Sequence, residues 1–125
     1  YNARSETLLE KPLFGKDFVQ NRCVIPVTGF CEWDGDGTGW NFLPQEEEML
    51  YLAGVCRKKA EGWEATVVTE HASGCVGEIH HRTPLILSGE NLRQWLYDEA
   101  QARQFLEEAK ERVLLKRKKM EGETL

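Results

Sequence analysis

Residues 22–33 read Arg22-Cys23-Val24-Ile25-Pro26-Val27-Thr28-Gly29-Phe30-Cys31-Glu32-Trp33, and this stretch decides the fold. Its β-branched residues predict a buried strand, and Gly29 allows another backbone to approach closely. The strand ends on Glu32, which has a cysteine and a tryptophan as neighbours in the sequence. Such neighbours make a carboxylate costly to ionise, which suits it to proton transfer. An ordinary exposed glutamate at a strand end is the alternative that the local sequence leaves open.

Length and composition indicate one globular domain over residues 1–125, with 41% hydrophobic and 30% charged residues. No apolar run approaches the ~20 residues of a transmembrane helix, and no signal-peptide pattern occurs. We therefore expect a cytoplasmic protein without a membrane partner. The net charge of -5 argues against a general nucleic-acid coat protein, but it is compatible with a local basic cleft.

Further strands and short helices alternate along the rest of the chain. The expected strands are 22–33, 40–43, 49–57, 63–69, 85–87 and 113–115, and a turn at 34–39 joins the first two as a hairpin. The expected helices are 5–11, 13–20 and those capped by Ser88 and Asp98. The basic run Lys116–Lys119 is interpreted as a solvated tail. The pattern predicts an α+β fold, with a strongly bent antiparallel sheet or partly closed β-barrel and flanking short helices.

Two kinds of site compete for the histidines and cysteines. The four cysteines form no C-x-x-C pair, so we interpret them as reduced structural residues; they are Cys23, Cys31, Cys56 and Cys75. A zinc site is the weaker alternative, because structural zinc ligands usually lie closer together in the sequence. Its ligands would be His71, Cys75 and either His80 or His81. We expect no metal and no cofactor.

An acid–base site is the favoured interpretation of His80 and Glu32. A histidine at the mouth of one strand and a carboxylate from another strand can move protons in opposite directions near neutral pH. This requires both side chains to line one cleft, which the sequence alone does not establish.

Four ordered blocks of sequence resemble the SOS response-associated peptidase (SRAP) family. The blocks are Asn2-Ala3-Arg4-Ser5-Glu6-Thr7, then Glu10-Lys11-Pro12-x-Phe14, then Arg22-Cys23-Val24-Ile25-Pro26-x-x-Gly29-Phe30-x-Glu32-Trp33, then Thr69-Glu70 with Ile79-His80-x-Arg82-x-Pro84-Leu85-Ile86-Leu87. The resemblance implies processing of abasic sites in single-stranded DNA by an N-terminal cysteine, exposed when the protein removes its own initiator methionine. The amine and thiol of that cysteine would close a thiazolidine crosslink on the opened sugar aldehyde, so peptidase and lyase-like activities are expected.

The same resemblance assigns three catalytic roles. Asn2 would orient the adduct and the N-terminal amine. Glu32 would shuttle protons during methionine removal and crosslinking. His80 would assist opening of the sugar ring and proton transfer to its oxygen.

Four further residues would contact DNA. Arg4 and Arg82 would bind flanking phosphates, a role that suits guanidinium groups. Thr69 would face the adduct, and Trp33 would offer an apolar or stacking surface beside it. The sequence departs from the family pattern at Cys31, His81 and Thr83, which are positions that affect packing more than proton transfer.

The cysteine nucleophile and its Cys-Gly-Arg start do not precede Tyr1 in this sequence. None of the four cysteines can replace it, because a thiazolidine needs the amine and the thiol on one residue. We expect a monomeric C-terminal part of a longer SRAP-type protein that binds single-stranded DNA with abasic sites and is nucleoid-associated when bound. A non-catalytic DNA-binding remnant and a small zinc-binding interaction domain are the alternatives.

Overall fold

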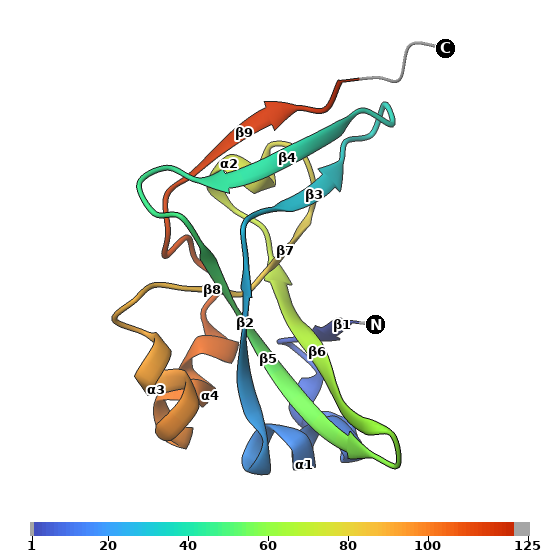
Figure 1. Cartoon of the computed structure of the whole chain (residues 1–125), viewed down its shortest axis with the longest axis vertical. Helices are drawn as coiled ribbons and strands as arrows, with labels where there is room; N and C mark the ends of the chain where they lie inside the picture. The colour runs from blue at the N-terminus through green and yellow to red at the C-terminus, as the bar shows by residue number, and fades with distance from the viewer. Residues whose placement is uncertain (1, 122–125) are drawn as a thin grey trace.

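The computed structural model describes residues 2–121, which form two curled sheets and short helices (Figure 1). The first sheet has the order β1-β6-β5-β2, with β7 beside β6 and β8 beside β5, and the second has the order β3-β4-β9. The strands are β1 (Asn2–Arg4), β2 (Arg22–Val27), β3 (Phe30–Trp33), β4 (Gly39–Pro44), β5 (Leu50–Lys59), β6 (Gly62–His71), β7 (Arg82–Pro84), β8 (Ile86–Leu87) and β9 (Leu115–Lys119). The helices are η1 (Leu8–Glu10), α1 (Pro12–Gln20), α2 (Gly74–Gly77), α3 (Leu92–Tyr97) and α4 (Glu99–Glu107).

The predicted α+β class and half-barrel shape are confirmed, but the larger sheet is mixed rather than wholly antiparallel. Strand β1 runs parallel to β6, with Asn2 opposite Val67 and Arg4 opposite Thr69. The two strands lie far apart in the sequence, so no hairpin forces an antiparallel direction. The hairpins β3–β4 and β5–β6 are antiparallel as predicted.

The stretch 22–33 is two strands in different sheets, so the prediction of one continuous strand is wrong. The chain bends at Thr28 and Gly29. A Cβ atom at Gly29 would lie 2.7 Å from the carbonyl oxygen of Phe42, which confirms the expected close backbone approach. The bend has a functional consequence, because it carries Glu32 into the second sheet, across from the first.

Several helix and strand boundaries also differ from the prediction. Residues 5–11 contain only the short η1 turn, because β1 and the turn after it use the residues before Leu8. Ser88 is not a direct cap; its hydroxyl donates to Asn91, which occupies the N-cap position of α3. Asp98 does cap α4 by accepting the backbone N–H of Gln101.

The basic run Lys116–Lys119 is not a free tail, because it forms most of β9 and pairs with β4. Strand β9 is the outer strand of its sheet, where charged side chains are favoured because they discourage pairing with another chain. The strand predicted at 113–115 begins only at Leu115.

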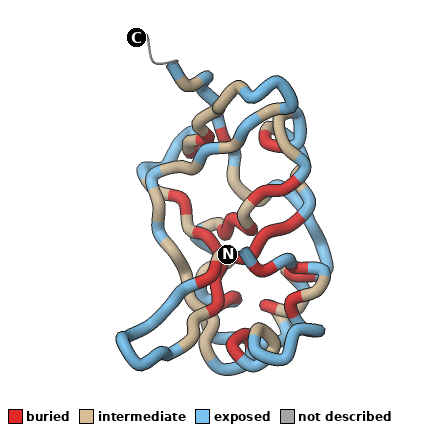
Figure 2. The backbone as a smooth tube through the Cα atoms, turned by 90° about the vertical axis from the view of Figure 1, so that its right-hand side faces the viewer, coloured by how far each residue is buried: buried red, intermediate tan, exposed pale blue. Residues whose placement is uncertain are grey.

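Two apolar clusters hold the elements together. The first lies between the larger sheet and the helices α1, α3 and α4, and includes the fully buried Phe18, Val68 and Trp95. The second lies between the two sheets and includes Phe42 and Leu50. Figure 2 shows the buried stretches gathered inside the molecule, with exposed residues along its outer loops. In the described residues no helix is long and apolar enough to cross a membrane.

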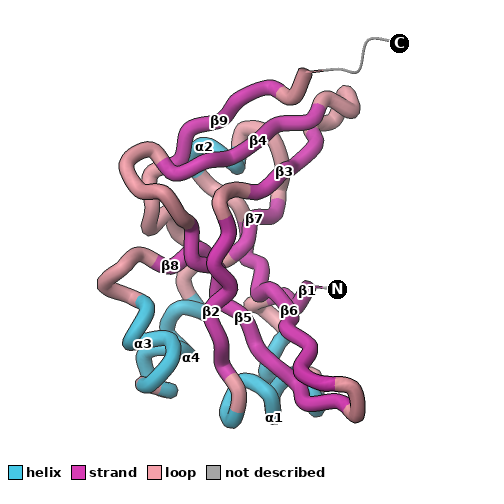
Figure 3. Tube along the Cα trace, viewed as in Figure 1, coloured by secondary structure: helices cyan, strands magenta, loops and turns pink. Residues whose placement is uncertain are grey.

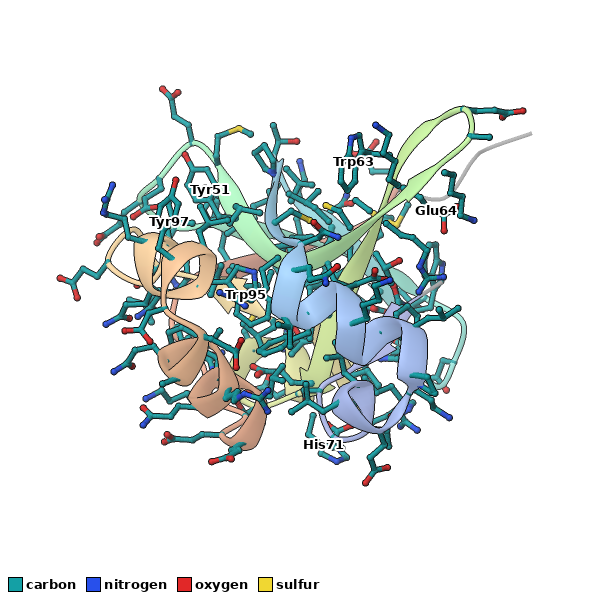
Figure 4. The ribbon with its side chains drawn as sticks, turned by 90° about the horizontal axis from the view of Figure 1, so that it is seen from below. Tyr51, Trp63, Glu64, His71, Trp95 and Tyr97 are labelled. Carbon is teal, nitrogen blue, oxygen red and sulfur yellow. The ribbon has the colours of Figure 1, made fainter. Side chains whose placement is uncertain are left out.

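The helices cover only one face of the larger sheet. Figure 3 shows α1, α3 and α4 grouped at the end of the molecule opposite β9, and Figure 4 shows them below the sheet with the β5–β6 hairpin projecting away from them. All four cysteines are free, as predicted. Cys31 is exposed and the other three are partly exposed, so none of them is a fully buried core residue.

Candidate nucleic-acid-processing site

A cleft of about 630 Å³ opens where strands from both sheets and the segment before β7 converge. It brings together every predicted site residue except Trp33: Asn2, Arg4, Glu32, Thr69, His80 and Arg82. Apolar side chains from Phe30, Leu52 and Val67 complete much of its wall. Residues from positions 2 to 82 therefore share one concave surface.

Strand alternation explains how β1 contributes two residues to the cleft. Asn2 and Arg4 are exposed on one face of the strand, while Ala3 between them is buried in the first apolar cluster. The parallel pairing with β6 then places Arg4 opposite Thr69, which lines the same cleft. With Ala3 buried, the Asn2 amide and the Arg4 guanidinium both face the cleft.

Glu32 and His80 lie close enough to exchange a proton through a small movement or a bound hydroxyl group. The carboxylate oxygen Oε2 is 3.7 Å from Nδ1 of His80, and both side chains are partly exposed. The backbone N–H of Arg82 donates to the same Nδ1 at 3.1 Å. The same Nδ1 lies 3.2 Å from the carbonyl oxygen of Arg82, so it can accept from the N–H or donate to the carbonyl, according to the tautomer. When the imidazole is protonated, it forms an ion pair with Glu32.

Arg82 is held inside the wall of the cleft, rather than extended towards solvent. Its guanidinium donates to Glu6 at 2.9 Å and to the Thr69 hydroxyl at 3.0 Å, and its side chain is only 10% exposed. Burial of Glu6 opposes ionisation, but hydrogen bonds from Arg82 and Ser5 outweigh it and lower the pKa of this carboxyl. Arg82 therefore positions Thr69 and the chain around His80. The sequence did not identify Glu6 as the partner of Arg82.

Trp33 does not reach the cleft. Along β3, Phe30 and Glu32 point into the cleft, and Cys31 and Trp33 point to the opposite, exposed face. The Trp33 side chain is 52% exposed. The structure therefore places Trp33 on the opposite face of β3 from the cleft, and not beside the predicted adduct.

A buried ion pair supports the cleft from behind. Glu70 follows Thr69 in β6 and points to the other face of the strand, where Arg112 Nη1 lies 3.2 Å from its carboxylate. Both side chains are 3% exposed. Burial raises the pKa of Glu70 to about 7, although the Arg112 guanidinium opposes the shift.

Glu70→Gln is expected to flatten the pH dependence of stability. A carboxyl with a raised pKa stabilises the fold most below its unfolded value of 4.5, and this contribution is lost as the pH rises through about 7. The difference should approach about 3 kcal/mol over that window. Urea unfolding of both proteins between pH 4.5 and 7.5 measures it, with Glu99→Gln as the exposed control. Parallel stability curves for the Glu70 variant and the original chain would contradict the prediction.

The residues that the structure describes do not bring the ligands of the zinc alternative together. No group of three or more histidine, cysteine or acidic side chains among them could hold a metal ion. His71 lies at the end of β6 beside Glu6, whereas Cys75 lies in α2, where its carbonyl accepts from Arg117. The two proposed ligands serve separate local contacts.

Comparison with known proteins connects this geometry to a family. The family model described as "SOS response associated peptidase (SRAP)" matches residues 1–121. "Abasic site processing protein YoqW" of Bacillus subtilis is 35% identical over 104 residues, which cover 76% of this chain and 46% of that protein. "Abasic site processing protein HMCES" of Gallus gallus is 34% identical over 124 residues, which cover 76% of this chain and 37% of that protein. The chain thus spans less than half the length of these relatives.

Solved structures show the same fold. A crystal structure of a protein from Bordetella bronchiseptica superposes with a TM-score of 0.79 at 24% identity, covering 96% of this chain and 64% of that one. A protein from Bacteroides thetaiotaomicron superposes with a TM-score of 0.74 at 27% identity, covering 84% of this chain and 52% of that one.

Proposed function

This chain belongs to the SOS response associated peptidase family, and from that premise we propose that its cleft binds single-stranded DNA at abasic sites and opens the abasic sugar. The observation that carries the proposal is the convergence of Asn2, Glu32 and His80 on one cleft with an arginine beside them. The relatives named abasic site processing proteins support the same substrate.

The chemistry that this cleft can perform is a proton exchange at the sugar. An abasic deoxyribose is a cyclic hemiacetal, and opening it breaks the bond from C1 to the ring oxygen and forms the C1 aldehyde. His80 in its protonated form would donate to the ring oxygen, while Glu32 would remove the proton from the C1 hydroxyl. No net proton is consumed, and their 3.7 Å separation would let the pair return to its starting state directly. Asn2 would hold the sugar oxygens by hydrogen bonds.

One exposed arginine of the cleft is available to bind a phosphate. Arg4 is exposed on the cleft side of β1 and forms no ion pair with any described residue. Arg82 contributes a second positive charge from within the wall, although Glu6 partly balances it. Glu32 adds a negative charge to the same cleft, so the exposed Arg4 is the group that would bind a phosphate there.

The covalent step is the finer part of the proposal. None of the four cysteines of this chain lines the cleft, and a thiazolidine needs an amine and a thiol on one residue. We propose that the complete protein forms a DNA–protein crosslink through an N-terminal cysteine beside Asn2, and that the opened aldehyde is its substrate. The residues described here would supply the supporting half of that site.

Binding measurements with the chain as it is test the proposal. We expect fluorescence anisotropy to show tighter binding to a single strand with a stable abasic analogue than to the same strand without it. Arg4→Gln should weaken binding several-fold and reduce the slope of log K against log salt by about 1. Arg93→Gln, an exposed arginine on α3, is the matched control. Equal affinity for both strands, or equal effects of the two substitutions, would reject the proposal.

A further inference from the structure

The face of the larger sheet that lines the cleft extends beyond it as a strip along β5 and β6. Three cross-strand pairs follow one another from the cleft towards the hairpin tip: Gly54 with Val67, Cys56 with Ala65, and Lys58 with Trp63. Val67 lines the cleft, and side chains two residues apart on a strand share a face, so all three pairs lie on the cleft face. Near the cleft, Gly54 is buried beneath the side chains of Cys23 and Ile25. Farther along, Ala65 and Lys58 are exposed, and the small side chains of Cys56 and Ala65 leave this part of the strip flat.

The strip ends on an exposed aromatic ring. The Trp63 side chain is 61% exposed, and Lys58 Nζ lies 6.0 Å from the centre of its ring. Figure 4 shows Trp63 on the side of the hairpin away from the helices, with Glu64 on the other side. Six residues of strand separate Trp63 from Thr69, a span of about 20 Å.

Charge is sorted between the two faces of this ribbon. On the cleft face, the three pairs carry one charged residue, Lys58. On the opposite face, Glu64 is paired with Lys59 at 3.0 Å and Arg57 with Asp17 at 2.8 Å. The strip therefore has Lys58 at its outer end and no carboxylate among its paired residues, and the cleft end holds Arg4 together with Glu32. A cation on an otherwise uncharged strip suits the phosphate of a single strand.

We propose that this strip is a track for the single strand that leaves the cleft, with Trp63 as a stacking platform for one base and Lys58 as a contact for its phosphate. A flat floor with an aromatic ring and a flanking cation is the combination that binds unpaired bases without sequence preference. The inference rests on the proposed function, because it extends the DNA path from the same cleft.

Substitution of Trp63 tests the proposal in the full chain, again by anisotropy with single strands that carry a stable abasic analogue. Trp63→Ala and Trp63→Leu should each weaken binding about fivefold or more, and Trp63→Phe should keep most of the affinity, because only a ring can stack on a base. Tyr97→Ala is the matched control, since Tyr97 is 73% exposed and lies beside Arg93 on the helix side. Circular dichroism checks that each variant keeps its fold.

Strand length gives a second readout. The loss of affinity caused by Trp63→Ala should disappear when both arms of the oligonucleotide, measured from the abasic position, are too short to span the distance of about 20 Å to Trp63. If Trp63→Ala binds long strands as tightly as the original chain while Arg4→Gln binds weakly, the track is overturned and the proposed function stands. If neither substitution matters, the proposed function fails as well. A change in oligomeric state without a change in DNA affinity would assign Trp63 to a protein contact and overturn the proposal.

Discussion

Glu32→Gln is expected to slow opening of the abasic sugar by about 10²–10⁴-fold, the range that a positioned proton carrier contributes. The glutamine keeps the size of the side chain and its place 3.7 Å from His80, but it cannot accept the hydroxyl proton. DNA affinity should stay the same or rise, because the substitution removes a negative charge from a phosphate-binding cleft. Loss of rate without loss of binding therefore separates chemistry from recognition.

The rate can be followed without the crosslinking cysteine. An aminooxy fluorophore captures only the open aldehyde, so its rate of reaction with abasic DNA, measured with the chain in saturating excess, reports on ring opening. His80→Gln should lose as much as Glu32→Gln, and the double variant should lose little more, because the two residues act as a unit. Glu64→Gln, on the opposite face of the β5–β6 ribbon, is the control. No acceleration by the original chain would favour the non-catalytic DNA-binding alternative.

Where the local sequence pattern decides the face of a strand or the position of a turn, these features could be predicted from the sequence. The alternation within β3 fixes which face Glu32 occupies, and the Asp34 turn fixes the hairpin that follows. Strand β1 was not among the expected strands, because Asn2–Arg4 become a strand by pairing with the distant β6. The same alternation, applied strictly, would also have placed Trp33 on the far side of β3 from Glu32. Neighbouring residues of a strand point to opposite faces, so the position of Trp33 next to Glu32 in the sequence does not bring it into the cleft.

Contacts between distant parts of the chain could not be predicted. Glu6 meets Arg82 across 76 positions, and Glu70 meets Arg112 across 42 positions. Each pair depends on how the sheet curls and on where the C-terminal segment returns, and neither feature has a periodic signature. The bend at Gly29 also depends on a distant contact. The sequence shows the glycine, but it does not show that the backbone it approaches is that of Phe42.

Arg112 connects the back of the cleft to the C-terminal segment. Besides its contact with Glu70, its guanidinium donates to the carbonyls of Phe105 and Glu108 at the end of α4. Carbonyls at the end of a helix lack partners within the helix, so the arginine also acts as a C-terminal cap. The sheet that carries Thr69, the helix α4 and the segment leading to β9 thus meet at one buried cation.

Arg112→Met should therefore lower the free energy of unfolding by about 3–5 kcal/mol, the usual effect of leaving one member of a buried ion pair without its partner. The loss should be larger at pH 8 than at pH 5, because the pKa of Glu70 is raised to about 7 and its carboxyl is mostly neutral at the lower pH. Adding Glu70→Gln should recover the pH-dependent part and leave the loss of the helix cap. Arg103→Met, which removes the exposed pair with Glu99, should cost less than about 1 kcal/mol in the same urea titrations. A loss of equal size at both pH values would show that the cap, and not the buried pair, is what Arg112 supplies.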